Sequence, residues 1–126
     1  MLKKFKQVWH RREIRDAIEQ KLQGLFGVKA TNANSKQLYK AIALVARDRI
    51  MERWAISEEK VHDANGKKLY YMSMEFLIGR ALSNNLANLA LDQTFAAVCK
   101  EFGVDLNEIK EMEADPGLGN GGLGRL

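Results

Sequence analysis

A glycine-rich segment near residue 120 has the clearest capacity for chemistry in this chain. Gly119, Gly121 and Gly124 satisfy the spacing G-x-G-x-x-G, which in a dinucleotide-binding fold follows a strand and opens a helix. Here it follows an acidic stretch and a proline, so dinucleotide binding is a weak interpretation. The glycines still allow backbone N–H groups to approach an anion, and a helix beginning near Gly122 would favour a phosphate, with Arg125 adding positive charge. A flexible linker is the alternative, and it fits the non-glycine residues less well.

Other residue types that support catalysis or metal binding lack the necessary spacing. His10, His62 and Cys99 are not spaced as metal ligands, so a structural or surface role is favoured and we expect no metal site. No serine lies in a G-x-S-x-G motif. Glu58 and Glu59 are adjacent, a spacing that points the carboxylates apart, so a solvated helix end is favoured over a glycosidase pair.

Apolar residues spaced three and four apart predict several helices that would carry these groups. The expected helices cover residues 5–23, 35–55, 80–102 and 105–114. Gly24 and Gly103 are the expected stop signals of the first and third, and Ser35 is the expected N-cap of the second. Asp105 and Glu108 have the spacing of a capping box that opens the last, short helix.

Residues 69–76 are the one strand candidate, because they are rich in aromatic residues and follow the turn-forming pair Asn65–Gly66. We expect the large side chains of this stretch to lie in a core rather than to contact ligands; they are Tyr70, Tyr71, Met72 and Met74. The sequence holds no second strand of matching quality, and each backbone group buried without a partner costs about 1–3 kcal/mol. The fold class predicted is mostly α with one isolated β-strand, in a chain that looks cut.

Composition and charge bound the class of protein. The 126 residues are 46% apolar, with one proline and one cysteine, which is typical of a globular chain in a reducing compartment. The longest apolar run, 41–46, is too short for a bilayer, so we expect a cytoplasmic protein without membrane or nucleic-acid partners. All of the excess positive charge lies in residues 1–30, which carry eight Lys/Arg and three Asp/Glu. A solvated helix face beside the core is favoured there; the alternative is a small independent binding protein with a basic N-terminal arm.

The sequence contains two long motifs, YYMSMEFLIGR at 70–80 and DPGLGNGGLGRL at 115–126, and two shorter stretches, RDRIMERW at 47–54 and NLANLAL at 85–91. The two long motifs closely resemble those of the glycogen (α-glucan) phosphorylases, and the two shorter stretches are similar to that family as well. The resemblance covers about residues 35–126. Leu77 stands where the animal muscle-type enzymes have a tyrosine, which is more similar to the bacterial and plant members. No match to the animal phosphorylation segment or nucleotide-effector tyrosines is present, so those controls are not expected.

The resemblance implies the N-terminal portion of an enzyme that cleaves α-1,4-glucan ends with orthophosphate and releases glucose 1-phosphate. It implies a two-lobed α/β fold of the GT-B kind, normally a homodimer. Residues 1–34 would then be a basic helix and connection, and residues 35–126 the start of the N-terminal α/β lobe, truncated after the glycine-rich loop. We expect these residues alone to be inactive.

The resemblance also assigns roles to individual residues. The family uses pyridoxal phosphate through its 5′-phosphate as an acid/base group, and its Schiff-base lysine lies downstream of this chain, which therefore holds no catalytic residue. Glu75, Gly121 and Leu123 would lie at the glucosyl and phosphate site, and Asn120 and Gly122 would contact the cofactor. From the residues alone, Glu75 is an ordinary half-buried carboxylate, and only the resemblance raises its importance.

Overall fold

The computed structural model of the chain describes residues 10–72, 76–77, 79–114 and 117–118. Within these residues the helices are α1 (Arg11–Phe26), the 3-10 turn η2 (Ala30–Asn32), α2 (Ser35–Asp63), α3 (Leu82–Asn88), α4 (Asp92–Glu101) and α5 (Leu106–Lys110). The strands are β1 (Phe76–Leu77) and β2 (Gly117–Leu118). The prediction of a mostly helical chain is therefore confirmed over the described residues.

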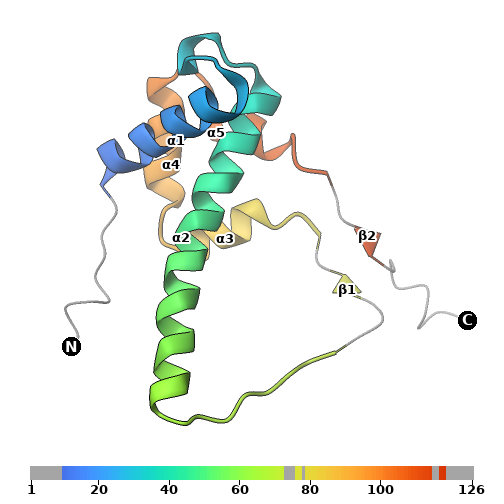
Figure 1. The fold of residues 1–126 in the computed structure, drawn as a ribbon. Coiled ribbons are helices and arrows are strands. Elements are labelled where there is room, and N and C mark those ends of the chain that lie inside the picture. Colours follow the sequence, from blue (N-terminus) through green and yellow to red (C-terminus); the bar gives the residue numbers. More distant parts are fainter. Residues whose placement is uncertain (1–9, 73–75, 78, 115–116, 119–126) are drawn as a thin grey trace, which may run out of the picture.

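The core lies where α1, α3 and α5 pack against α2, and α4 packs against those same three helices (Figure 1). Helix α1 contributes Ile14, Ile18 and Leu22, each fully buried, at the four-residue spacing that places side chains on one helix face. The other fully buried large side chains are Leu38, Ile42, Val45, Leu86, Phe95, Val98, Cys99 and Ile109. A single apolar cluster thus joins all five α-helices.

Helix α2 is much longer than the part of it that is buried in the core. Its 29 residues span about 44 Å, yet its buried residues all lie between Leu38 and Ala46. The second half projects beyond the other helices (Figure 1), and Trp54 in this half is 59% exposed. The predicted end near residue 55 is wrong, because the helix continues to Asp63. Asn65, two residues further on, has a left-handed backbone with φ 49°. The amide of Gly66 then donates to the carbonyl of Val61 at 2.8 Å.

The ends of α1 differ in detail from the sequence-based expectation. The helix begins at Arg11, whereas the expected residues 5–9 lie outside the described part of the chain. It runs through Gly24 and ends at Phe26, since Gly27 rather than Gly24 adopts the left-handed conformation, with φ 65°. A glycine inside a helix costs only about 1 kcal/mol relative to alanine, which neighbouring packing offsets.

The N-cap of α2 is Asn34 and not Ser35 as predicted. The Asn34 side chain accepts from the Gln37 amide at 2.9 Å, and the Gln37 side chain accepts from the Asn34 amide at 3.0 Å. This reciprocal pair is a capping box, and it satisfies two backbone donors at the helix start. The cap lies one residue earlier than expected because Asn34 has the extended backbone (φ −83°, ψ 170°) that a cap requires.

We predict that Asn34→Ala lowers the free energy of unfolding by about 0.5–1 kcal/mol, since it removes the acceptor for the Gln37 amide at an exposed helix end. Ser35→Ala is the matched control and should change stability by less than about 0.5 kcal/mol. Urea unfolding followed by circular dichroism measures both variants. Equal losses in the two variants would contradict the assignment of Asn34 as the cap.

The helix expected over residues 80–102 is two helices. α3 ends at Asn88 and α4 begins at Asp92, because Ala90 adopts a left-handed backbone with φ 57°. The amide of Leu91 donates to the carbonyl of Leu86 at 3.0 Å, and that of Ala90 to the carbonyl of Ala87 at 3.0 Å. These two bonds form a Schellman motif, and Leu91 is buried beside the core. The chain direction therefore changes at Ala90.

The predicted strand is also corrected. Residues 69–72 have no regular secondary structure, and residues 73–75 lie outside the description. The expectation of a core environment is wrong for the described part, because Leu69, Tyr70, Tyr71 and Met72 are 77–97% exposed. The strand present is β1, and it is not isolated: it pairs with β2. A strand requires a neighbour for its backbone groups, and β2 offers only two residues.

Candidate functional site

All five residues to which a site role was assigned lie outside the described residues. They are Glu75, Asn120, Gly121, Gly122 and Leu123. The structure describes the segments that border them: β1 and residues 79–81 on one side, and residues 111–114 and β2 on the other. These bordering segments are therefore the part of the candidate site whose geometry the structure shows.

Strands β1 and β2 bring the two family-like motifs together. The pair is antiparallel, with Phe76 opposite Leu118 and Leu77 opposite Gly117, although the partners are about forty residues apart in the sequence. In this register the N-terminal end of β1 and the C-terminal end of β2 lie at the same end of the pair. Figure 1 shows the two strands side by side, away from the helical core.

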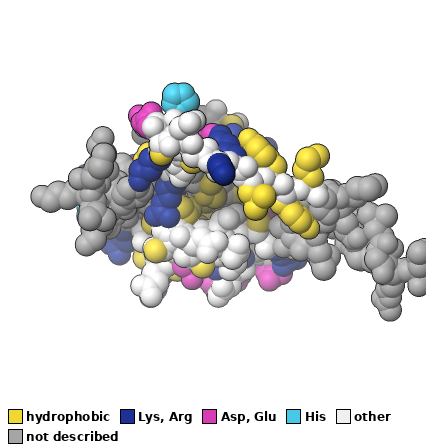
Figure 2. Space-filling view, turned by 90° about the horizontal axis from the view of Figure 1, so that it is seen from below, with side chains coloured by type: hydrophobic (Ala, Val, Ile, Leu, Met, Phe, Trp, Pro, Cys, Tyr) yellow, Lys and Arg dark blue, Asp and Glu magenta, His cyan; other side chains and the backbone are white. Residues whose placement is uncertain are grey.

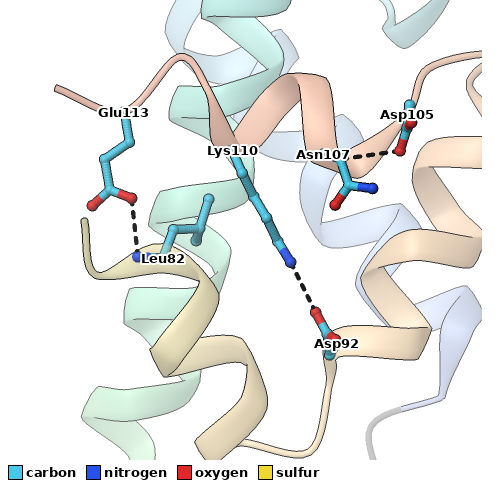
Figure 3. Close-up of polar contacts among 6 residues, drawn as sticks. All are labelled: Leu82, Asp92, Asp105, Asn107, Lys110 and Glu113. Carbon is cyan, nitrogen blue, oxygen red and sulfur yellow. Dashed lines mark hydrogen bonds and ion pairs between the residues drawn. The ribbon is translucent and has the colours of Figure 1, made fainter. Parts of the chain in front are cut away.

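A carboxylate joins the same two segments a few residues from the ladder. Glu113 accepts from the amide of Ala81 at 2.7 Å and from the amide of Leu82 at 3.1 Å, and the second bond is drawn in Figure 3. A negative charge at the start of a helix satisfies free N–H groups and interacts favourably with the helix dipole. We name these three residues the Glu113 clasp. Sequence reasoning missed it because the partners are 31 and 32 residues apart, without a local signal.

An ion pair lies next to the clasp. Arg80 Nη1 and Glu111 Oε2 are 2.8 Å apart, with side chains 45% and 70% exposed. Exposed pairs of this kind contribute at most about 1 kcal/mol. The Glu113 clasp differs from this ion pair in burial and in partners. Glu113 is half-buried, and both of its carboxylate oxygens accept from backbone amides.

A shallow hollow of about 250 Å³ lies between α2, α3 and Glu113. Tyr39, Arg47 and Asn85 supply its polar groups. Burial raises the pKa of the Tyr39 phenol, and the nearby negative charge of Glu113 raises it further. Tyr39 is therefore a neutral hydrogen-bonding group at physiological pH.

The other acidic residues of this region fasten the short helices. Asp105 accepts from the amide of Asn107 at 3.0 Å and so is the N-cap of α5, as predicted. The donor is Asn107 and not Glu108, so the cap differs from the predicted capping box, and the helix ends at Lys110 rather than near residue 114. Lys110 Nζ lies 3.1 Å from Asp92 Oδ1, which ties α5 to the start of α4 (Figure 3). No group of three His, Cys, Asp or Glu side chains suited to a metal ion exists within the described ranges.

Three basic side chains of the described N-terminal region form ion pairs with acidic side chains of other helices. Arg11 Nε lies 2.8 Å and Arg15 Nη1 3.6 Å from the carboxylate of Glu101 on α4. Lys21 Nζ lies 3.1 Å from Asp48 on α2. These pairs hold α1 against its neighbours, which favours the interpretation of a solvated helix face over that of an anion-binding arm.

Cys99 is fully buried in the core, and burial raises its thiol pKa to about 11 from 9.0. Because the folded state holds the proton more tightly than the unfolded state, stability is full below pH 9 and falls as the pH rises through about 11. We predict that the free energy of unfolding falls less between pH 9 and 11 in Cys99→Ala than in the wild type. The fall that remains in the variant comes from the other groups that titrate in this range. Urea unfolding of both proteins at pH 8, 9, 10 and 11 measures the difference, and parallel pH profiles would contradict the prediction.

The comparisons with known proteins agree with the motifs. The chain is 42% identical over 94 residues to the muscle form of glycogen phosphorylase from Ovis aries. It is 40% identical over 94 residues to the muscle form from Homo sapiens and to the brain form from Bos taurus. Each match covers 75% of this chain and 11% of the relative. No family model matches the chain.

These findings define a mostly helical chain that carries a glycine-rich motif at residues 119–124. The chain belongs to the glycogen phosphorylase family, and it spans about a tenth of the length of the curated relatives that it matches. These relatives are animal enzymes, so they do not support the expectation of a bacterial type. Among the described helices, none has the length and apolar character needed to cross a membrane.

Proposed function

We propose that this chain is the N-terminal part of an α-1,4-glucan phosphorylase, which transfers the terminal glucosyl residue of a glucan to orthophosphate and gives glucose 1-phosphate. The supporting observation is the pairing of β1 with β2, which joins the two motifs in one antiparallel register. The identity of 40–42% over 94 residues to glycogen phosphorylases agrees with it. In the whole enzyme the fold would be of the two-lobed GT-B kind, and the protein a cytoplasmic homodimer.

The strand pair supports a shared site for the residues assigned by resemblance. Glu75 precedes Phe76, and the glycine-rich segment begins directly after Leu118. Since Phe76 pairs with Leu118, the chain enters β1 and leaves β2 at the same end of the ladder. We propose that Glu75, Gly121 and Leu123 contact the glucosyl residue and the substrate phosphate there.

The proposed cofactor is pyridoxal 5′-phosphate, whose phosphate would supply acid/base chemistry beside the substrate phosphate. Its Schiff-base lysine would come from outside this chain. Asn120 would donate to or accept from the pyridoxal ring substituents, and the amide at Gly122 would face a phosphate. This assignment agrees with the capacity of a glycine-rich segment to present backbone N–H groups to an anion.

Exposed apolar side chains support burial of this chain against further protein. Leu69, Tyr70, Tyr71 and Met72 are at least 77% exposed, and Trp54 is 59% exposed. Figure 2 views the molecule from the end toward which α2 projects, and hydrophobic side chains gather on one side of this face. Patches of this kind are typical of surfaces that other protein covers.

The test is phosphorolysis by the protein that the native cell makes with these residues. The purified protein is incubated with a maltodextrin and orthophosphate, and glucose 1-phosphate is measured with a coupled enzyme assay. We expect product that depends on orthophosphate, together with the absorbance of bound pyridoxal phosphate after alkaline release. Residues 1–126 alone are expected to be inactive. A whole protein without phosphorolysis on glycogen, starch and maltodextrin would contradict the proposal.

A further inference from the structure

We infer that Glu113 is a positioning residue of the proposed phosphorylase, which holds the two motif segments in register through the amides of Ala81 and Leu82. The inference rests on the proposed function. Its structural part is the Glu113 clasp, with hydrogen bonds of 2.7 and 3.1 Å between one carboxylate and two consecutive amides.

The ladder between the motifs is too short to fix its own register. It contains two residue pairs, and a two-stranded ribbon is marginal in water even at greater length. A slip of one residue in such a pair reverses the side on which every side chain lies. A second, independent tie between the same two segments is therefore needed to define how they meet.

The hydrogen bonds of Glu113 provide this second connection, and they lie only a few residues along the chain from both strands. It lies four residues before Gly117, and Ala81 lies four residues after Leu77. The ladder and the clasp thus connect the same two segments at two successive points. Each oxygen of the half-buried carboxylate has its own backbone donor, an arrangement that fixes orientation as well as distance.

The neighbouring Arg80–Glu111 pair does not have this capacity. Both of its side chains are largely exposed, so water and salt compete with the contact. Glu111 and Glu113 therefore form a matched pair of acidic residues, two positions apart, of which one should matter for the geometry of the motifs and the other should not.

The experiment compares Glu113→Gln with Glu111→Gln in the whole protein. The amide NH₂ of glutamine cannot accept from a backbone N–H, so Glu113→Gln removes one of the two acceptors at nearly constant volume. Hydrogen exchange measured by mass spectrometry follows peptides that contain Ala81 and Leu82, and steady-state phosphorolysis gives kcat and KM for the glucan. Glu113→Asp keeps both acceptors on a shorter side chain and serves as the conservative variant, and as the replacement if Glu113→Gln does not fold.

We expect faster exchange at residues 79–88 in Glu113→Gln and a fall in kcat of about tenfold, with KM changed less than twofold. Glu113→Asp should retain more of the kcat, and Glu111→Gln should match the wild type in every measurement. Unchanged exchange, unchanged kcat despite faster exchange, or equal effects in Glu111→Gln would each overturn the inference. A wild-type protein without phosphorolysis would overturn the proposed function and the catalytic role with it, whereas the exchange data would still report whether the clasp exists.

Discussion

Replacing Phe95 with alanine is expected to lower the free energy of unfolding by about 3–5 kcal/mol. Phe95 is a fully buried large side chain of α4, and α4 packs against α1, α3 and α5. Removing the ring leaves a cavity where these helices meet, and tight neighbours collapse only partly into it. Since a domain is typically stable by only about 5–15 kcal/mol, this one change removes a large part of the total.

The matched control is Trp54→Ala on the projecting half of α2. It removes a larger aromatic side chain, but one that is 59% exposed, so it should cost less than about 1 kcal/mol in the same helical unit. Thermal and urea unfolding monitored by far-ultraviolet circular dichroism compare the two variants. Similar losses in both would contradict the core described around Phe95.

Helices of this chain could be predicted where the signal is local. Ile14, Ile18 and Leu22 recur every fourth residue and are all fully buried in α1. Asp105 was identified as a cap and is one, because a cap and the amide that it accepts from are neighbours in the sequence. Such features depend on a few adjacent residues, although the cap of α2 and the stop of α1 lie one and three residues from their predicted positions.

Pairings between distant segments could not be predicted in the same way. β1 meets β2 about forty residues away, and Glu113 meets Leu82 across 31 residues. The residues of a stretch such as 69–76 do not indicate which segment a strand there pairs with, or how many residues of that segment pair. The strand was therefore predicted as long and isolated, whereas the described strand is short and paired. The site residues themselves, from Glu75 to Leu123, lie outside the described residues and remain predictions from resemblance.

Among the helix ends with a left-handed backbone, Gly103 and Ala90 form a matched pair, one with glycine and one with alanine. Gly103→Ala should lower the free energy of unfolding by about 1 kcal/mol, and Ala90→Gly should raise it by a similar amount. Both positions have positive φ, 78° and 57°, a conformation that costs roughly 1–2 kcal/mol for a residue with a Cβ. The stabilisation expected for Ala90→Gly is reduced in part, because glycine gives the unfolded chain a greater conformational entropy.

The surroundings of these positions make the test specific to the backbone. A Cβ added at Gly103 would have no neighbour within 4 Å, so any loss in Gly103→Ala arises from φ and not from a clash. Ala90 is exposed, so Ala90→Gly removes little packing. Urea unfolding of both variants should then give free energies of unfolding on opposite sides of the wild-type value, about 2 kcal/mol apart. If Ala90→Gly is instead destabilising by about 1 kcal/mol, as for a glycine inside a helix, α3 and α4 form one continuous helix and the break at Ala90 is wrong.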